Sequence, residues 1–140
     1  MTKAEEIMSL AKKLAESCSN VMVGSIGNQD YPYVKSMFKM ETNGLKEVWL
    51  STNTSSKRVS HFRSNPKACL YFVDPVEYKG LLLLGKIDIL EDLESKKRLW
   101  REGFDIYYPK GIADPDYCVL RFTACKGNYY HNLKNIDFEL

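Results

Sequence analysis

The stretch Trp49-Leu50-Ser51-Thr52-Asn53-Thr54-Ser55-Ser56-Lys57-Arg58 decides how the fold of this chain is interpreted. Its pattern is that of a strand that ends in hydroxyl-bearing residues and continues into a helix starting with two adjacent cations. A helix N-terminus presents unpaired N–H groups and the positive end of a dipole. Together with hydroxyls and a Lys-Arg pair, it suits a phosphate group. An ordinary capped helix followed by solvated charges explains the same residues, so the rest of the chain must decide.

Length and composition restrict the class of protein. The 140 residues fit a single domain, residues 1–140, with a core of its own. A net charge of +2 gives no electrostatic case for nucleic acid. No apolar run is long enough to span a bilayer, and the N-terminus lacks the apolar core of a signal peptide. The four cysteines and two histidines lack metal-ligand spacing, so we expect reduced thiols, no metal and a cytoplasmic location.

The order of predicted elements indicates a mainly β (α+β) fold. Hairpin signals such as Asn43-Gly44 join most neighbouring strands, and antiparallel sheets of this size tend to close into a barrel that removes their edges. A capped helix from Thr2 to about Ser19 precedes the first strand. Further helices are expected at about 55–64 and 91–102, and strands at 21–26, 31–40, 47–52, 67–73, 81–90, 117–125 and 128–132.

Four local expectations can be checked directly. Gly85 inside a strand predicts a bulge or a close backbone approach. Lys126-Gly127-Asn128 predicts a turn between the last two strands. Leu93 and Trp100 are the expected buried residues of the helix at 91–102, and Asp114-Pro115-Asp116 has the composition of a turn.

Several short motifs, in this order, resemble the pyridoxamine 5′-phosphate oxidase-like, FMN-binding split-barrel family, and within it the short members similar to general stress protein 26. The resemblance covers nearly the whole chain. It rests on Pro32-x-x-Lys35-Ser36-Met37, Trp49-Leu50-Ser51-Thr52, Ser56-Lys57, Asn65-Pro66-Lys67-Ala68-Cys69-Leu70, Leu84-Gly85-Lys86, Trp100, the 108–117 run and Tyr129-Tyr130. It implies a six- to seven-stranded antiparallel split β-barrel with about three flanking helices.

The resemblance also implies an FMN site. Lys35 falls where the family usually has an arginine that contacts the FMN phosphate, and the backbone of Ser36 and Met37 would run beside the isoalloxazine. Two further groups follow from the resemblance. The strand end that touches the ring and the ribityl chain is matched by Leu50, Ser51 and Thr52, and the phosphate-binding helix start by Ser56, Lys57 and Arg58.

Members of this family are homodimers with FMN in the interface, so the resemblance implies that a second copy completes each site. The candidates for that contribution are Trp100, Tyr108 and Tyr130, and Tyr130 matches an aromatic position next to the flavin. Since the flavin performs the redox chemistry, we name no catalytic residue.

The sequence departs from the family pattern at three places. Lys35 lacks the bidentate fork of an arginine, and Gly80 stands where the oxidases have a glutamine that contacts the flavin. The C-terminal segment 132–140 lacks the Arg-x-His-Asp-type signature for the pyridoxal phosphate substrate, so we do not expect vitamin B6 oxidation.

The resulting expectation is an FMN-dependent oxidoreductase acting on an unknown small molecule, without nucleic-acid or membrane partners. Three alternatives stay open. The chain is a flavin-binding stress or redox-sensor protein without turnover, a barrel that binds single-stranded nucleic acid through Lys35, Lys57 and Arg58, or a haem-degrading or deazaflavin-using relative, because one barrel hosts several chemistries.

Overall fold

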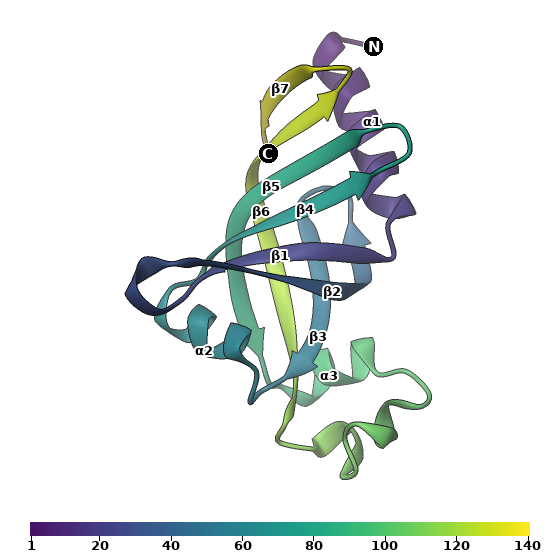
Figure 1. Cartoon of the computed structure of the whole chain (residues 1–140). Coiled ribbons are helices and arrows are strands. Elements are labelled where there is room, and N and C mark those ends of the chain that lie inside the picture. The colour runs from purple at the N-terminus through teal and green to yellow at the C-terminus, as the bar shows by residue number, and fades with distance from the viewer.

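The computed structural model describes all residues from 1 to 140 as one barrel with helices around it (Figure 1). Three short 3-10 turns interrupt the loops at Asn28–Asp30, Phe104–Ile106 and Gly111–Ala113. The main elements are α1 (Lys3–Ser17), β1 (Asn20–Ile26), β2 (Pro32–Asn43), β3 (Glu47–Asn53), α2 (Lys57–Ser64), β4 (Lys67–Asp74), β5 (Lys79–Leu90), α3 (Leu93–Leu99), β6 (Tyr117–His131) and β7 (Lys134–Glu139). None of the helices combines the length and the apolar character needed to span a bilayer.

The seven strands form one antiparallel sheet in the order β3-β2-β1-β4-β5-β6-β7. Pairing of β3 with the first half of β6 closes six strands into a barrel, and β7 is added to the second half of β6. The expected mainly β fold, with six to seven strands and three helices, is confirmed. Most strand pairs are sequence neighbours, which is why hairpin signals were sufficient to predict the architecture.

The barrel opens where β2 and β3 separate. The two strands pair only from Lys39↔Leu50 to Asn43↔Glu47, with a bulge between Lys39 and Glu41. Residues 32–38 of β2 pair only with β1, and residues 51–53 of β3 pair only with β6. Helix α2 follows β3 directly and lies between the end of β3 and the tip of the β1–β2 hairpin (Figure 1). The opening is therefore bordered by two strand edges and a helix N-terminus.

The core fills the barrel, and α1 covers one end of it. Thr2 and Glu5 form a capping box, and α1 buries Ile7, Ala11 and Leu14 on one face. A second, smaller cluster lies outside the barrel wall beneath α3 and consists of Trp49, Leu99, Tyr117 and Val119. Helix α3 is shorter than expected: Asp92 caps it, Leu99 is buried, and Leu93 is 56% exposed, so the prediction for Leu93 was wrong.

The expected turn at 126–128 was also wrong, because β6 runs without a break from Tyr117 to His131. Gly127 serves close packing, since a Cβ there would lie 2.6 Å from the ring of Phe138. The chain reverses instead at Asn132 and Leu133, whose φ angles of 53° and 63° match a type I′ hairpin turn. The expectation for Gly85 is confirmed. The β5–β6 register shifts beside it, and a Cβ at Gly85 would collide with the Thr123 carbonyl oxygen.

Candidate functional site

The start of α2 presents free donors. Ser56 is buried and caps the helix, because its Oγ accepts a hydrogen bond from the Val59 N–H at 3.3 Å. The backbone N–H groups of Lys57 and Arg58 have no acceptor in the structure, and no acidic side chain occupies the first turn. The expected phosphate-binding helix start is thus a capped N-terminus whose next two N–H groups are free, with the carboxylate of Asp116 bonded to the Ser55 N–H just before the cap.

Three cations at the opening lack counterions. Neither Lys35, Lys57 nor Arg58 takes part in an ion pair. Arg58 is half-buried, and its Nε is the one buried side-chain nitrogen or oxygen of the chain without a hydrogen-bond partner. Leaving a buried donor unpaired costs about 1–3 kcal/mol. An anion with acceptor oxygens at this point would satisfy Arg58, so the residues present fit a phosphate group.

On the β2 side of the opening, the groups available to a ligand are mainly backbone peptide groups and not side chains. Met37 is buried in the core, and Ser36 points to the outer face, where its Oγ accepts a hydrogen bond from Asn20 Nδ2 at 3.3 Å. Lys35 shares the face of Met37 but remains exposed at the opening. Because β3 has separated from β2 here, one edge of this segment carries unpaired peptide groups. Backbone contact of this edge to a planar ring stays a prediction.

The β3 side is similar. Leu50 is fully buried in the core, Thr52 is nearly so, and Ser51 is half-buried. All three pair with β6, while Ser51 and Thr52 have no partner on the β2 side. The nine predicted residues thus belong to the three segments that border the opening: Lys35, Ser36, Met37, Leu50, Ser51, Thr52, Ser56, Lys57 and Arg58. The side chains of Met37 and Leu50 lie in the core instead, and that of Ser36 points to the outer face.

Asp116 holds the turn that leads into α2. Its carbonyl oxygen accepts the Thr54 N–H at 2.7 Å, and its Oδ1 accepts the Ser55 N–H at 2.9 Å. The Thr54 hydroxyl donates to the Pro115 carbonyl at 2.8 Å. Sequence reasoning missed this role, because Asp116 lies 61 residues from Ser55 and its local pattern indicates only a turn. Asp114 supports the same loop: backbone N–H groups of Asp116 and Lys110 hydrogen-bond its carboxylate and lower its pKa.

The aromatic candidates fall into two separate places. Trp100 and Tyr108 pack around buried Tyr117, with ring centroids 5.3 Å and 4.9 Å from it. Burial raises the pKa of Tyr117 to about 12 and also raises the pKa of Tyr108. Since Tyr117 pairs with Asn53, this aromatic cluster adjoins the end of β3. Tyr130 lies thirteen residues further along β6, roughly 40 Å away along the strand, opposite Gly80.

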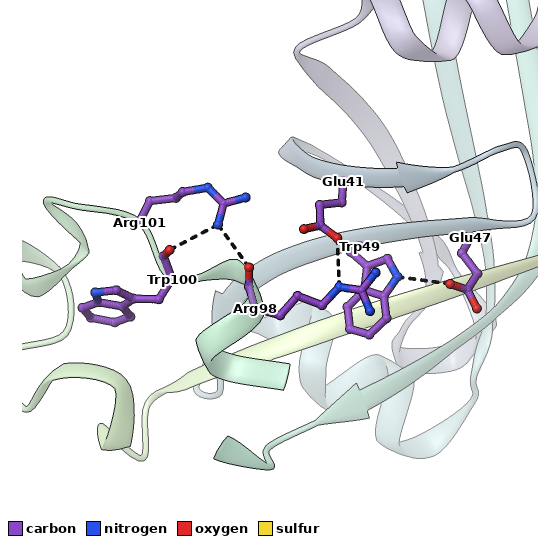
Figure 2. A network of polar contacts seen from close by, with 6 residues as sticks. All are labelled: Glu41, Glu47, Trp49, Arg98, Trp100 and Arg101. Atoms are coloured by element: carbon purple, nitrogen blue, oxygen red, sulfur yellow. Dashed lines mark hydrogen bonds and ion pairs between the residues drawn. The ribbon is translucent and has the colours of Figure 1, made fainter. Parts of the chain in front are cut away.

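Polar contacts fix α3 beside β3 (Figure 2). The Arg98 guanidinium lies 3.9 Å from the centroid of the Trp49 ring, and its Nε lies 2.9 Å from Glu41 Oε2. The indole Nε1 of Trp49 donates to Glu47 at 3.3 Å, and the Arg101 guanidinium donates to the carbonyls of Arg98 and Trp100. These contacts position the segment that carries Trp100.

The opening differs from the main pockets of the chain. Five pockets with volumes of about 210 to 570 Å³ are lined by other residues. The predicted site residues thus lie along an edge of the barrel in the single chain. None of them lines one of these five pockets.

Comparison with solved structures identifies relatives along the whole chain. A protein from Clostridium acetobutylicum, related to general stress protein 26 of Bacillus subtilis, is 50% identical, with 97% of this chain and 96% of that chain covered and a TM-score of 0.88. A pyridoxamine 5′-phosphate oxidase-related, FMN-binding protein from Nostoc punctiforme is 12% identical, with 100% and 98% covered and a TM-score of 0.69. A heme-binding protein from Mycobacterium smegmatis is 13% identical, with 95% and 57% covered and a TM-score of 0.76.

The family model described as pyridoxamine 5′-phosphate oxidase like matches residues 5–138. The chain therefore belongs to the pyridoxamine 5′-phosphate oxidase-like family, as its sequence motifs indicated. Among curated proteins, none matches the chain. The two relatives below 25% identity bear on the fold alone.

Proposed function

We propose that this protein binds FMN at the opening between β2 and β3 and acts as an oxidoreductase on a small molecule. The observation that carries the proposal is the buried, unpaired Nε of Arg58 beside the free N–H groups at the start of α2. A dianionic phosphate would satisfy these donors together, and the unpaired cations Lys57 and Lys35 would balance its charge.

Each group of residues would have a separate task. Ser56, Lys57 and Arg58 would bind the phosphate, and Lys35 would approach it from β2. The unpaired edges of β2 at 35–37 and of β3 at 51–52 would orient the ring through peptide groups. FMN supplies the electron transfer when bound, so the protein groups orient it and exclude competing acceptors.

A second copy of the chain would complete the site. The outer face of β1, β2 and β4 carries exposed apolar side chains, among them Met22, Val34, Phe38 and Tyr71, which are 38–69% exposed. The strand register places Met22 opposite Tyr71, so these side chains form one continuous surface. Tyr130 is too far along β6 to reach the opening of its own chain, and we propose that it contacts the FMN of its partner.

The relatives bring two cofactors into consideration. The Nostoc relative is described as FMN binding, and the family is named after pyridoxamine 5′-phosphate oxidase. The Mycobacterium relative is described as heme binding, and haem iron needs an axial side-chain ligand. His61 Nδ1 lies 2.8 Å from Ser25 Oγ, and its ring packs against Tyr33. A histidine held through Nδ1 in this way still offers Nε2 to a metal, so the cofactor has to be identified by the titration described next.

The test is a titration of the purified protein with FMN, in which the quenching of flavin fluorescence reports binding. We expect saturable binding at one FMN per chain, and Lys57→Ala and Arg58→Ala to weaken it at least tenfold. Lys97→Ala is the matched control, because Lys97 is an exposed cation on α3 and belongs to neither α2 nor the unpaired strand edges. Absence of flavin binding, or a haem absorption band in its place, would overturn the proposal.

Turnover needs a separate measurement. Anaerobic mixing of the FMN-loaded protein with NADH or NADPH should bleach the flavin absorbance if the protein is an oxidoreductase with a nicotinamide reductant. Bound flavin that no reductant of this kind bleaches at a catalytic rate would favour a flavin carrier or redox sensor instead.

A further inference from the structure

Four lysines line a cavity of about 570 Å³ that includes no residue of the flavin opening. Lys67 comes from β4, Lys86 from β5, Lys126 from β6, and Lys46 from the turn before β3. The other lining residues are small or apolar, together with Thr123 and Cys125, and no carboxylate is among them. We call this cavity the lysine groove.

The strand register makes the lysine groove electrostatically unfavourable when it is empty. Lys67 and Lys86 are direct cross-strand partners, and like charges in that position are destabilising. None of the four lysines forms an ion pair. The nearest carboxylates in register are Glu139 opposite Lys126 and Glu47 opposite Thr123. Glu47 already accepts the hydrogen bond of the Trp49 indole.

Protection of a sheet edge does not explain Lys86 and Lys126. Lysine commonly guards exposed edge strands against pairing with another chain. Here Lys86 pairs with both β4 and β6, and Lys126 pairs with both β5 and β7. Lys67 lies beyond the last β1–β4 pair and is paired with β5 alone, and Lys46 lies in a turn.

Backbone geometry shapes the floor of the lysine groove. The β5–β6 register shifts between Leu84 and Gly85, so Cys125 is left without a partner on β5. Gly85 allows the close approach of the Thr123 carbonyl, which a Cβ would prevent. The bulge separates Thr123 from Lys126 and leaves a shallow apolar floor between lysines. The volume is within the range of small-molecule sites.

We propose that the lysine groove binds a small oligoanion, a molecule that carries two or more phosphate or carboxylate charges. One such anion between Lys67 and Lys86 replaces their mutual repulsion with two attractions. Lys46 and Lys126 add two further cations to the lining, and the hydroxyl of Thr123 supplies a directional donor. This site is separate from the flavin opening and does not rest on the proposed function.

The experiment is a titration monitored by two-dimensional NMR of the backbone amides, in buffer with 150 mM NaCl. Inorganic pyrophosphate and citrate are the probes, and they distinguish a phosphate ligand from a carboxylate ligand. We expect saturable shifts at Gly85, Thr123 and Lys126 with at least one of the two probes. The amides of Ser55 to Arg58 report separately on the flavin opening, so failure of one site leaves the other measurable.

A matched pair of variants tests the lysines. Lys67→Gln/Lys86→Gln should weaken binding at the lysine groove at least tenfold. Lys97→Gln/Lys134→Gln removes the same charge elsewhere and should change it less than twofold. Three outcomes would overturn the proposal: shifts confined to 55–58, shifts that stay linear with probe concentration, or equal losses in both variants. A Lys67→Gln/Lys86→Gln protein that changes only its dimerisation would show that the lysines serve a partner chain, which also overturns it.

Discussion

The carboxylate Oδ1 of Asp116 lies 2.9 Å from the backbone N of Ser55, and the carbonyl oxygen of the same aspartate lies 2.7 Å from the backbone N of Thr54. One residue at the approach to β6 therefore holds two consecutive donors of the turn before α2. A turn held in this way presents the helix N-terminus in one conformation, which reduces the ordering cost of binding an anion there.

Asp116→Ala should weaken FMN binding while the fold persists. The carbonyl contact stays, but the Ser55 N–H loses its acceptor, and we expect the dissociation constant to rise about tenfold, which corresponds to about 1.4 kcal/mol. Asp116→Asn keeps an acceptor oxygen and should stay within about threefold of the parent, since it costs mainly the charge of one hydrogen bond. Fluorescence titration measures both. Equal losses in the two variants would show that the negative charge, and not the hydrogen bond, matters.

Gly85→Ala should destabilise the barrel. The added Cβ would collide with the Thr123 carbonyl oxygen, which belongs to a rigid strand and cannot rotate away. We expect the free energy of unfolding to fall by about 1–3 kcal/mol, as for other overpacked sites, in urea unfolding followed by circular dichroism.

Gly44→Asn is the matched control for Gly85→Ala. Gly44 has a φ of 58° and open space around its Cα, and asparagine tolerates the left-handed region. Its unfolding free energy should change by less than about 1 kcal/mol. A larger loss at Gly44 than at Gly85 would contradict the interpretation of Gly85 as a site of close backbone approach.

The barrel and the segments that carry the candidate site were predictable because both depend on local signals. Strand alternation and turn residues such as Asn43-Gly44 specify hairpins, and hairpins between sequence neighbours build most of this sheet. The stretch from Leu50 to Arg58 contains the end of β3, the N-cap of α2 and two cations within nine residues. These signals required no knowledge of distant contacts.

Features that depend on distant contacts were missed. Gly127 resembles a turn residue locally, yet the ring of Phe138 packs where its side chain would be. The turn at Asn132 and Leu133 escaped notice because leucine seldom adopts a positive φ. The role of Asp116 depends on closure of the barrel by β3 and β6, which brings residues 61 positions apart into contact.

Tyr117→Phe should alter the pH dependence of stability. Burial raises the pKa of Tyr117 to about 12, above the usual value of about 10 for an unfolded chain. Its contribution to stability is therefore complete below pH 10 and is lost as the pH rises from 10 towards 12. The phenylalanine variant lacks this alkaline loss. It also starts about 1 kcal/mol less stable at pH 7, because the hydrogen bond from the Tyr117 hydroxyl to the Lys96 carbonyl is gone.

Urea unfolding at pH 7 and at pH 10.5 measures the Tyr117 effect as a difference between variants. Tyr107→Phe is the control, since Tyr107 is 73% exposed. The Tyr107→Phe variant should show the same dependence of unfolding free energy on pH as the parent. An identical alkaline loss in Tyr117→Phe and the parent would show that other groups cause it.

Arg98→Ala should loosen α3 through its contact with Trp49 more than through its ion pair with Glu41. The ion pair joins side chains that are 46% and 33% exposed, and such pairs contribute about 0–1 kcal/mol and weaken with salt. The guanidinium stacked 3.9 Å from the Trp49 ring centroid contributes about 0.5–1 kcal/mol and also covers the indole. We therefore expect Arg98→Ala to lower the free energy of unfolding by about 1 kcal/mol. Most of that decrease should persist in 0.5 M NaCl.

Glu41→Gln separates the two contributions, because it removes the ion pair and leaves the stacked guanidinium in place. Its loss should be below about 0.5 kcal/mol and should vanish in 0.5 M NaCl, since salt screens exposed charges. Trp49 and Trp100 are the two tryptophans of the chain, and both adjoin α3. Their fluorescence during urea unfolding therefore reports on this region. Equal, salt-sensitive losses for Arg98→Ala and Glu41→Gln would show that the ion pair with Glu41 holds α3, and that the stacking on Trp49 adds little.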